Sequence, residues 1–307
     1  MKTKSRSKLI MMCGLPGSGK STYAKNTGYI VCSSDDIREE FGLQHSKEDN
    51  NRVFQILHQR IKSLLLDGKN VVYDATNISM KQRVGFLKSI EHIDCHKICV
   101  FMAVPYEMCV IYNNCRERSI PCDVIERMYH AIKIPAYFEG WDEIIVEYDH
   151  YNDIFSQRYI DIFFNKYFDQ ANSHHSLSLL SHCQKAYNFY KKNLSVNPDY
   201  FLERNVCLMH DIGKMYTKTF QKKDGTIDTE AHYYGHDSVG AYIWILYNMK
   251  NNEDTKYALL SANYINYHMY PYFWRNNEKM ENKYRKLFGD SFYGAILRIH
   301  EADKAAH

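Results

Sequence analysis

The sequence predicts an α/β domain, with a parallel sheet flanked by helices, followed by an all-α domain. In the first half of the 307 residues, short apolar runs alternate with helical periodicities, as in parallel sheets whose strands are joined by helices. After about residue 150 strand-like runs become rare, helical spacing dominates, and most of the 15 histidines occur. A chain of this length suits two domains, which we place at residues 1–152 and 153–307.

Five strands are expected in the first domain, because five short apolar runs stand between turn-forming segments. They are Lys8–Cys13, Tyr29–Cys32, Val71–Tyr73, His96–Val104 and Ile144–Val146. Helices are expected between them, at Ser21–Asn26, from Asp36, through Val53–Leu65, and at Lys81–Ile90, Met108–Arg116 and Cys122–Ile132.

The segment behind the first strand reads Gly-Leu-Pro-Gly-Ser-Gly-Lys-Ser from Gly14 to Ser21. Glycines allow successive backbone N–H groups to turn toward phosphate oxygens, and the lysine and serine of this pattern reach the β/γ-phosphates and Mg²⁺. We therefore expect a site for ATP or another nucleoside triphosphate with Mg²⁺ on Ser21. Its residues are Gly14, Pro16, Gly17, Ser18, Gly19, Lys20, Ser21 and Thr22.

Composition excludes several other classes of protein. The net charge is only +3, so any surface for nucleic acid must be local. The nine cysteines form no Cys-x-x-Cys pair, which argues for a reducing compartment, the cytoplasm, and against a disulfide framework or zinc ribbon. No run of 18 apolar residues is present, so no membrane span is expected.

Charged residues follow the second strand at Asp35, Asp36 and Arg38. The carboxyl ends of parallel strands face the ligand crevice. A carboxylate there can take the proton of an attacking hydroxyl, and an arginine can hold a substrate phosphate. We expect Asp36 to cap the next helix and Asp35 to be the base.

Two further clusters lie near the expected crevice. Asp74-Ala75-Thr76-Asn77 follows the third strand, where an acid can position Mg²⁺-bound water; a turn held by local hydrogen bonds is the alternative. Arg116 and Arg118 lie before Pro121. A mobile arginine there would stabilise a moving phosphoryl group, whereas lone arginines would be ordinary surface residues.

Together these motifs resemble the kinase domain of phage-type polynucleotide 5′-kinases, over roughly residues 8–148. The segment Pro121–Tyr129 is particularly similar to the helix after the lid in that family. The resemblance implies that Asp35 is the general base and that Arg38 contacts the phosphate next to the 5′-hydroxyl. It makes Arg116 the lid arginine, with Arg118 as competitor because the spacing to Pro121 is one residue short.

The resemblance extends to substrate preference. The Asp-Asp-Ile-Arg element at 35–38, together with Asp74 and Asn77, favours a polynucleotide acceptor. Ser34 stands where the family pattern has an arginine, so the preferred substrate can differ from that of the phage enzymes.

The second half contains a set of metal-type ligands around the adjacent pair His210-Asp211. One carboxylate has two oxygens, so this pair can bind one metal or bridge two. The other candidates lie in separate segments with helical spacing, as a site inside a helix bundle requires. They are His182, His236, His268 and Asp303. Such ligands suit one or two divalent transition metals: Mn, Fe, Ni, Co or Zn.

This spacing resembles the HD phosphohydrolase superfamily, over roughly residues 155–307. The resemblance makes His182, His210, Asp211 and Asp303 ligands of a first metal, and His236 and His268 ligands of a second. Lys214 would contact the phosphate or the attacking water. His175, beside His174, would touch the substrate or lie on the surface. His232, His300 and His307 are assigned as exposed or internally satisfied. The implied reaction is hydrolysis of a phosphomonoester or phosphodiester.

The combined interpretation is an enzyme that heals nucleic-acid ends, RNA ahead of DNA, with a separate ligase as its partner in the pathway. One half would phosphorylate 5′-hydroxyl ends, and the other would hydrolyse 2′,3′-cyclic phosphate and 3′-phosphate ends. A phage-encoded enzyme in the host cytoplasm would fit this interpretation. Two alternatives remain: a nucleoside kinase fused to a nucleotidase, and a nucleotide-sensing module with a structural, metal-free bundle. The oligomeric state is not predicted.

Overall fold

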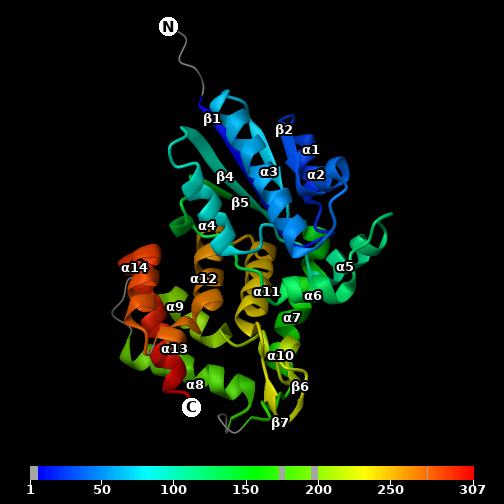
Figure 1. Ribbon diagram of the computed structural model, residues 1–307. Coiled ribbons are helices and arrows are strands. Elements are labelled where there is room, and N and C mark those ends of the chain that lie inside the picture. Colours follow the sequence, from blue (N-terminus) through cyan, green and yellow to red (C-terminus); the bar gives the residue numbers. More distant parts are fainter. Residues whose placement is uncertain (1–5, 173–176, 195–199, 275) are drawn as a thin grey trace. The chain divides into compact units, whose positions relative to one another are not determined.

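A computed structural model describes residues 6–172, 177–194, 200–274 and 276–307 (Figure 1). The chain divides into two compact units, one of Met1–Ile125 with Pro135–Glu147 and one of Glu126–Ile134 with Tyr148–His307. The first unit therefore ends at Glu147 rather than at residue 152. The segment Glu126–Ile134, which the sequence placed in the first domain, belongs to the second unit.

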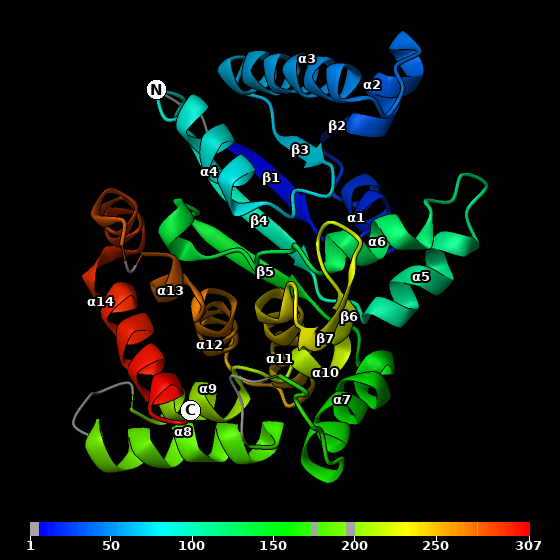
Figure 2. The same ribbon diagram turned by 60° about the horizontal axis from the view of Figure 1, so that its bottom comes forward.

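The first unit is built on a five-stranded parallel sheet with the strand order β2-β3-β1-β4-β5 (Figure 1 and Figure 2). Every strand expected from the sequence is present, with ends shifted by one or two residues. The strands are β1 (Ser7–Cys13), β2 (Ile30–Ser33), β3 (Val71–Asp74), β4 (Cys95–Met102) and β5 (Glu143–Glu147).

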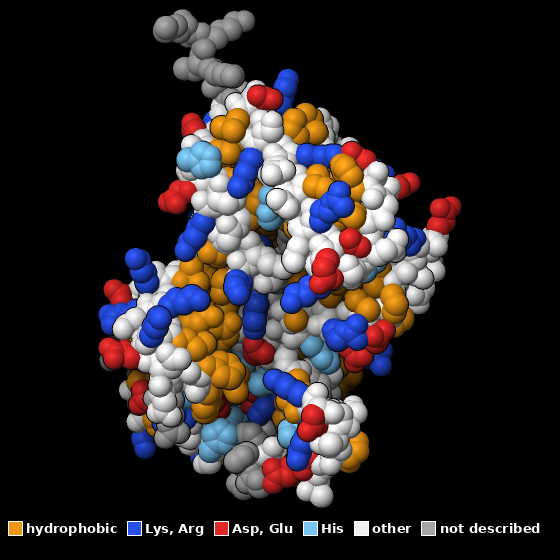
Figure 3. Space-filling view, in the orientation of Figure 1, with side chains coloured by type: hydrophobic (Ala, Val, Ile, Leu, Met, Phe, Trp, Pro, Cys, Tyr) orange, Lys and Arg blue, Asp and Glu red, His pale blue; other side chains and the backbone are white. Residues whose placement is uncertain are grey.

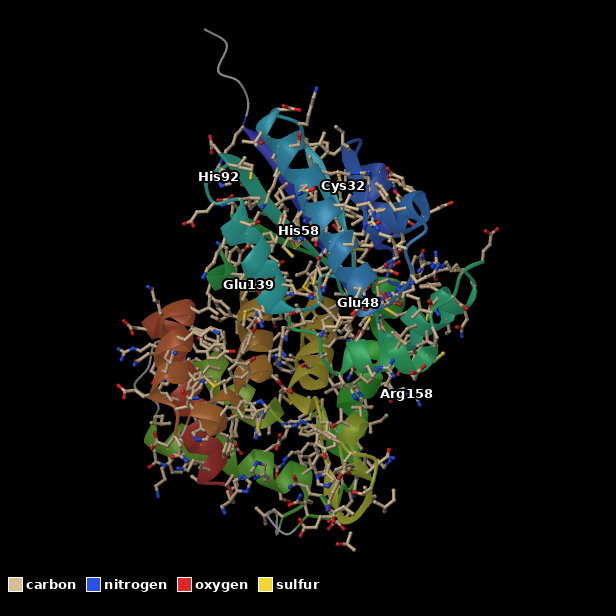
Figure 4. All side chains as sticks on the ribbon, viewed as in Figure 1. Cys32, Glu48, His58, His92, Glu139 and Arg158 are labelled. Atoms are coloured by element: carbon tan, nitrogen blue, oxygen red, sulfur yellow. The ribbon has the colours of Figure 1, made fainter. Side chains whose placement is uncertain are left out.

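Helices cover both faces of the sheet. On one face Ala24 of α1 (Lys20–Asn26) packs in a cluster with Met12 and Val72. Because successive strand residues point to opposite faces, Tyr73 lies on the other face, where its ring contacts His58 of α3 (Lys47–Leu66) and Phe86 of α4 (Met80–Ser89) (Figure 4, where His58 is labelled). Burial on both faces explains why β3 is a continuous apolar run rather than an alternating one.

The remaining helices of this part of the chain are short. They are α2 (Ser34–Phe41), α5 (Tyr106–Asn114), α6 (Cys122–Tyr129) and two single 3-10 turns, Tyr137–Glu139 and His150–Asn152. The expected helix Cys122–Ile132 is thus too long by one turn. Its last residue contacts α12 (Thr255–Tyr267) instead, since the Asn266 amide nitrogen lies 3.5 Å from the Ile132 carbonyl oxygen.

A buried ion pair ties α4 to the connection before β5. Arg83 Nε and Nη2 donate to the two carboxylate oxygens of Glu139 at 2.7 and 2.6 Å, and both side chains have 0% exposure (Glu139 is labelled in Figure 4). Glu139 also accepts from the Trp141 indole, and Arg83 Nη1 donates to Asn77 O at 2.9 Å. The pair therefore braces the loop after β3.

The second unit is largely helical, with α11 buried at its centre against α12 and α7. Its helices are α7 (Asp153–Asn165), α8 (Leu179–Asn193), α9 (Tyr200–Met209), α10 (Lys214–Thr217), α11 (His236–Lys250), α12 (Thr255–Tyr267), α13 (Tyr270–Trp274) and α14 (Glu278–Lys304). No helix in the described ranges combines the length and the apolar character that crossing a bilayer would need.

The second unit is not all-α, which corrects the sequence-based expectation. An antiparallel pair, β6 (Thr219–Gln221) and β7 (Ile227–His232), stands between α10 and α11. Its turn places Gly225 at φ 90°, which glycine adopts without strain. The dipeptide Asp224-Gly225 is a hairpin signal that could have revealed this element.

We predict that Arg83→Met lowers the free energy of unfolding of the first unit by about 3–5 kcal/mol, because it leaves the buried Glu139 carboxylate without its counter-charge. Urea denaturation would measure the change. Arg60→Met is the matched control: Arg60 pairs with Glu40 at 2.6 Å on the surface, where such a pair is worth about 1 kcal/mol or less. Equal losses in the two variants would contradict the prediction.

Candidate active sites

The phosphate-binding loop joins β1 to α1, and three of its glycines, Gly14, Gly17 and Gly19, have positive φ. Gly17 has φ 80°, and a Cβ there would lie 2.1 Å from the Cys109 carbonyl oxygen. Gly19 has φ 86° and forms the N-cap of α1. Pro16 is buried in the loop, and Thr22 is exposed on α1. The Ser18 hydroxyl is buried and has no hydrogen-bond partner within the described residues.

Lys20, Ser21 and Asp74 come together at the carboxyl ends of β1 and β3. Lys20 is 8% exposed, and its Nζ donates to the Leu15 carbonyl at 2.7 Å. Burial lowers the pKa of Lys20, and the Asp74 carboxylate opposes this shift. Burial raises the pKa of Asp74 above its ordinary value. The hydrogen bond with the Ser21 hydroxyl and the charge of Lys20 act in the opposite direction. A hydroxyl beside a carboxylate is a suitable oxygen pair for Mg²⁺.

The cap of α2 is Ser33, so the expectation that Asp36 caps this helix is wrong. The Ser33 hydroxyl accepts hydrogen bonds from the N–H groups of Asp35 and Asp36 at 3.1 and 3.3 Å. Both carboxylates are therefore left exposed in the first helical turn. Both also act to raise the pKa of Asp74, which places them on the side of the phosphate-binding loop.

Arg38 is buried at 6% exposure and braces the connection between α2 and α3. Its Nη1 donates to the Gln44 carbonyl at 2.6 Å, and its Nη2 to Asn50 Oδ1 at 2.5 Å. Asn77 is likewise engaged with the protein. Its amide nitrogen donates to the Met12 carbonyl at 2.8 Å, which fastens the loop after β3 to the end of β1.

The two lid candidates lie in the exposed segment after α5 and act on different groups. Arg116 is among the charges that lower the pKa of Lys20. The Arg118 guanidinium lies 3.5 Å from His45 Nε2, beside the α2–α3 connection. Burial and the charges of Arg38 and Arg118 lower the pKa of His45. Arg116 is therefore the lid candidate whose charge acts on Lys20.

In the second unit, four predicted ligands converge into what we call the first ligand group: His182, His210, Asp211 and Asp303. They come from α8, from the turn after α9 and from α14. His182 Nε2 lies 3.0 Å from Asp303 Oδ1, and His210 Nε2 lies 3.3 Å from both Asp303 Oδ1 and Asp211 Oδ2. All four side chains are buried.

Asp211 also belongs to a second ligand group, with His236 and His268. His236 is the first residue of α11, and His268 is the C-cap of α12. Their Nε2 atoms lie 3.3 and 3.7 Å from Asp211 Oδ1, which is the carboxylate oxygen not turned to His210. The Asp211 carboxylate therefore stands between two sets of imidazoles, as a bridging ligand would.

The imidazole tautomers test whether these residues fit a metal. Nδ1 of His210, His236 and His268 lies 2.7–2.8 Å from a main-chain carbonyl three residues earlier, so Nδ1 carries the proton. In the neutral rings the Nε2 lone pairs then face inward, and those of His236 and His268 stand only 3.4 Å apart. Facing lone pairs repel unless a cation lies between them, and this orientation is typical of metal-binding histidines. The ligand set fits divalent cations.

Ionised acids add to this demand for positive charge. Burial by itself would raise the pKa of Asp211, but Lys214 and His210 hold it well below its usual value. Burial would likewise raise the pKa of Asp303, but hydrogen bonds with His182 and His210 hold it well below its usual value. Two buried carboxylates therefore remain negative among imidazoles.

Lys214 supports the centre directly. Its Nζ lies 2.7 Å from Asp211 Oδ2 and donates to Gln170 Oε1 at 3.0 Å. Tyr272 OH donates to Asp303 Oδ2 at 3.0 Å. The spacing of residues gave no indication of Gln170 or Tyr272, because α13 and residue 170 reach the site only through the fold.

A pocket of about 620 Å³ opens over both ligand groups. Several histidines of the second unit are visible on the face drawn in Figure 3. The lining residues are Asn172, Asp211, Lys214, Ala231, His232, Tyr233, Tyr234, His236, Met269, Tyr272, Asp303, Lys304 and His307.

The three histidines assigned as exposed or satisfied have mixed outcomes. His232 bonds Asp228 at 3.0 Å yet lines the pocket, and the ring of His300 packs on Tyr272. His307 lines the pocket with its Nε2 3.6 Å from Asp303 Oδ1; the i,i+4 spacing on a helix could have indicated this contact. His174 and His175 lie outside the described residues.

Comparisons with known proteins show similarity over part of the chain. The family model described as AAA domain matches residues 9–135. The chain is 27% identical over 149 residues to L-seryl-tRNA(Sec) kinase of Methanococcus maripaludis, covering 44% of this chain and 56% of that protein. It is 30% identical over 153 residues to the "Putative bifunctional polynucleotide phosphatase/kinase" of Acanthamoeba polyphaga mimivirus, covering 47% and 34%.

Among solved structures, a chain of the Pnkp1/Rnl/Hen1 RNA repair complex shares 26% identity over 41% of this chain and 44% of that one, with a TM-score of 0.36. The chain thus spans about half or less of the length of these relatives. The first unit is a P-loop α/β domain with sequence similarity to kinases. The family match ends at residue 135, so it covers the first unit up to that residue together with the segment Glu126–Ile134 of the second.

We predict that divalent metal binds more tightly as the pH rises. Without metal, burial acts to lower the pKa of His210, but Asp211 and Asp303 raise it to about 10. Below that pH a proton on His210 must leave before a cation binds. The affinity for Mn²⁺ should therefore rise up to about tenfold per unit between about pH 6 and pH 8. Calorimetry in buffers of different ionisation enthalpy would count the released protons; a pH-independent affinity would contradict the prediction.

Proposed function

We propose that this chain heals nucleic-acid ends, RNA in preference to DNA. The first unit would transfer the γ-phosphate of a nucleoside triphosphate to a 5′-hydroxyl end. The second unit would hydrolyse 2′,3′-cyclic phosphate and 3′-phosphate ends. The observation that carries the proposal is that one chain holds both a phosphate-binding loop with an exposed carboxylate after the neighbouring strand and a buried centre of six converging metal-type ligands.

In the proposed kinase step, the acceptor oxygen bonds to the γ-phosphorus. The bond between that phosphorus and the oxygen of the leaving nucleoside diphosphate breaks at the same time. The exposed Asp35 carboxylate would take the hydroxyl proton. Lys20 would contact the triphosphate, as would the buried Ser18 hydroxyl, which has no partner in the described part of the chain. Mg²⁺ held by Ser21, with Asp74 beside it, would offset the charge on the phosphates, and Arg116 would stabilise the group in transfer.

The acceptor side is proposed to lie along α2. Arg38 follows Asp35 by one helical turn, and its bonds to Gln44 and Asn50 hold its guanidinium in one place. We propose that this fixed guanidinium contacts the phosphate next to the 5′-hydroxyl. The names of the two curated relatives, a seryl-tRNA kinase and a polynucleotide phosphatase/kinase, describe acceptors that carry or consist of nucleic acid, which supports this choice.

The pocket of the second unit suits an anionic substrate. Its acids among the described lining residues are Asp211 and Asp303, both ligands, whereas Lys214, Lys304 and His307 are cationic or can become so. Bound divalent cations would lower the pKa of a water molecule and offset charge at phosphorus. One water would open the cyclic phosphate by breaking one P–O bond, and a second would release phosphate from the monoester.

A second candidate deserves a direct comparison, because a volume of about 620 Å³ can also enclose a free mononucleotide. The second unit would then be a nucleotidase and the first a nucleoside kinase. One oligonucleotide with a 5′-hydroxyl and a 2′,3′-cyclic phosphate, incubated with γ-labelled ATP, tests both halves. We expect label at the 5′ end and loss of the 3′ phosphate. Activity only on nucleosides and mononucleotides would replace the proposal with this alternative.

We predict that Asp35→Ala lowers the rate of 5′-phosphorylation by about 10²- to 10⁴-fold, as loss of a general base does, and leaves 3′-end hydrolysis unchanged. Single-turnover gel assays would measure both rates. Asp36→Ala is the matched control, because Asp36 is the neighbouring exposed acid of the same helical turn. Equal rates in the two variants would exclude Asp35 as the base.

We predict the reverse selectivity for Asp211→Ala. It removes the carboxylate shared by both ligand groups, so hydrolysis and metal binding should be lost while 5′-phosphorylation persists. The same gel assay, with elemental analysis of the purified variant, checks this. A folded variant that loses both activities would mean that the two sites are not independent.

A further inference from the structure

The segment Glu126–Ile134 belongs to the second unit although the chain before and after it belongs to the first. Its side chains and backbone contact the start of α11 and the end of α12. These two helix ends carry His236 and His268. A segment contributed from within the P-loop half of the sequence therefore lies directly behind the second ligand group.

At the start of α11, the segment contacts the residues on both sides of His236. Lys133 Nζ forms an ion pair with the Asp237 carboxylate, and each side chain is 17% exposed. On the other side, Gly235 has φ 76°, and a Cβ there would lie 2.2 Å from the His130 carbonyl oxygen. The backbone that delivers His236 is therefore packed against this segment without room for a side chain.

At the end of α12, the same segment contacts Asn266, two residues before His268. Lys133 Nζ donates to the Asn266 carbonyl at 3.1 Å, and the Ile134 N–H donates to Asn266 Oδ1 at 2.8 Å. The Asn266 amide nitrogen lies 3.5 Å from the Asp237 carbonyl and the Ser238 hydroxyl. One lysine and one asparagine thus join the two helix ends.

The position of the Lys133 ammonium is further restricted by aromatic rings. Its Nζ lies 5.6 Å from the centroid of Tyr267 and 5.7 Å from that of Tyr270, within the range of cation–π attraction. The ammonium is therefore surrounded by a carboxylate, a carbonyl and two rings. This enclosure differs from a surface ion pair, whose long side chains sample many positions.

We propose that Lys133 is a positioning residue of the second metal site. It clamps the start of α11 to the end of α12 and so holds His236 and His268 with their Nε2 atoms facing each other at 3.4 Å. The inference rests on the proposed function, since it supposes that the second ligand group binds a metal. Without the clamp, repulsion between the Nε2 lone pairs of His236 and His268 would push the two helix ends apart.

The test is a titration of the metal-free 307-residue chain with Mn²⁺ alone, in which calorimetry records the binding. Lys133→Met by itself leaves a buried carboxylate unpaired and can fail to fold. The decisive variant therefore replaces both partners, Lys133→Met with Asp237→Leu, which removes the clamp without an orphan charge. Lys133→Arg keeps the positive charge. Lys279→Met is the control, because Lys279 lies on the exposed surface. His268→Ala shows what loss of the second ligand group does to binding.

We expect the double variant to bind one Mn²⁺ as the unaltered chain does and the other about 10- to 100-fold more weakly, as when a supporting partner of a ligand is removed. The Lys133→Arg variant should retain most of the affinity for the second Mn²⁺. Nucleotide binding by the first unit should be unchanged in every variant. If the folded double variant binds both ions with normal affinity, or with equally reduced affinity, the clamp is overturned and the proposed function is not. An unaltered chain that binds fewer than two ions would overturn the clamp together with the proposed two-metal hydrolase.

Discussion

The carboxylate of Asp211 is the constraint around which the second unit is arranged. An ionised group with 2% exposure must be paired, because an uncompensated buried charge costs several kcal/mol. Its two oxygens meet His210, His236, His268 and Lys214. His210 and Lys214 are neighbours of Asp211 in the sequence, but His236 and His268 come from α11 and the end of α12, so the bundle must close correctly for the acid to be stable. The same closure assembles the ligand set.

The first unit positions its residues by another principle. Parallel strands end at one edge of the sheet, so the loops after β1, β2 and β3 deliver Lys20, Asp35 and Asp74 to the same edge. Polar contacts then fasten these loops to one another. Asn77 ties the loop after β3 to β1, and the buried Arg83–Glu139 pair braces that loop from behind. Backbone geometry provides the phosphate site, and buried polar side chains make it rigid.

The two units share no ligand residue but are interleaved along the chain. The helix α6 begins in the first unit and ends in the second, and the residues after it contact the helix ends that carry His236 and His268 before the chain returns to β5. A boundary drawn between two continuous domains therefore misplaces Glu126–Ile134. Any truncation designed at residue 152 would separate this segment from the helices that it contacts.

The sequence by itself determined the strand and helix pattern and the phosphate-binding loop, because these depend on local periodicity and on residue types at short spacing. It also indicated the six metal-type ligands, through their residue types and their order along the second half of the chain. Only the tertiary structure decided which groups those residues meet. It assigned the α2 cap to Ser33 instead of Asp36, engaged Arg38 and Asn77 with the protein, and added Tyr272, Gln170 and His307 around the centre. The β6–β7 hairpin and the Lys133 contacts also arose there. Partners separated by tens of residues leave no periodic signal, since packing rather than spacing brings them together.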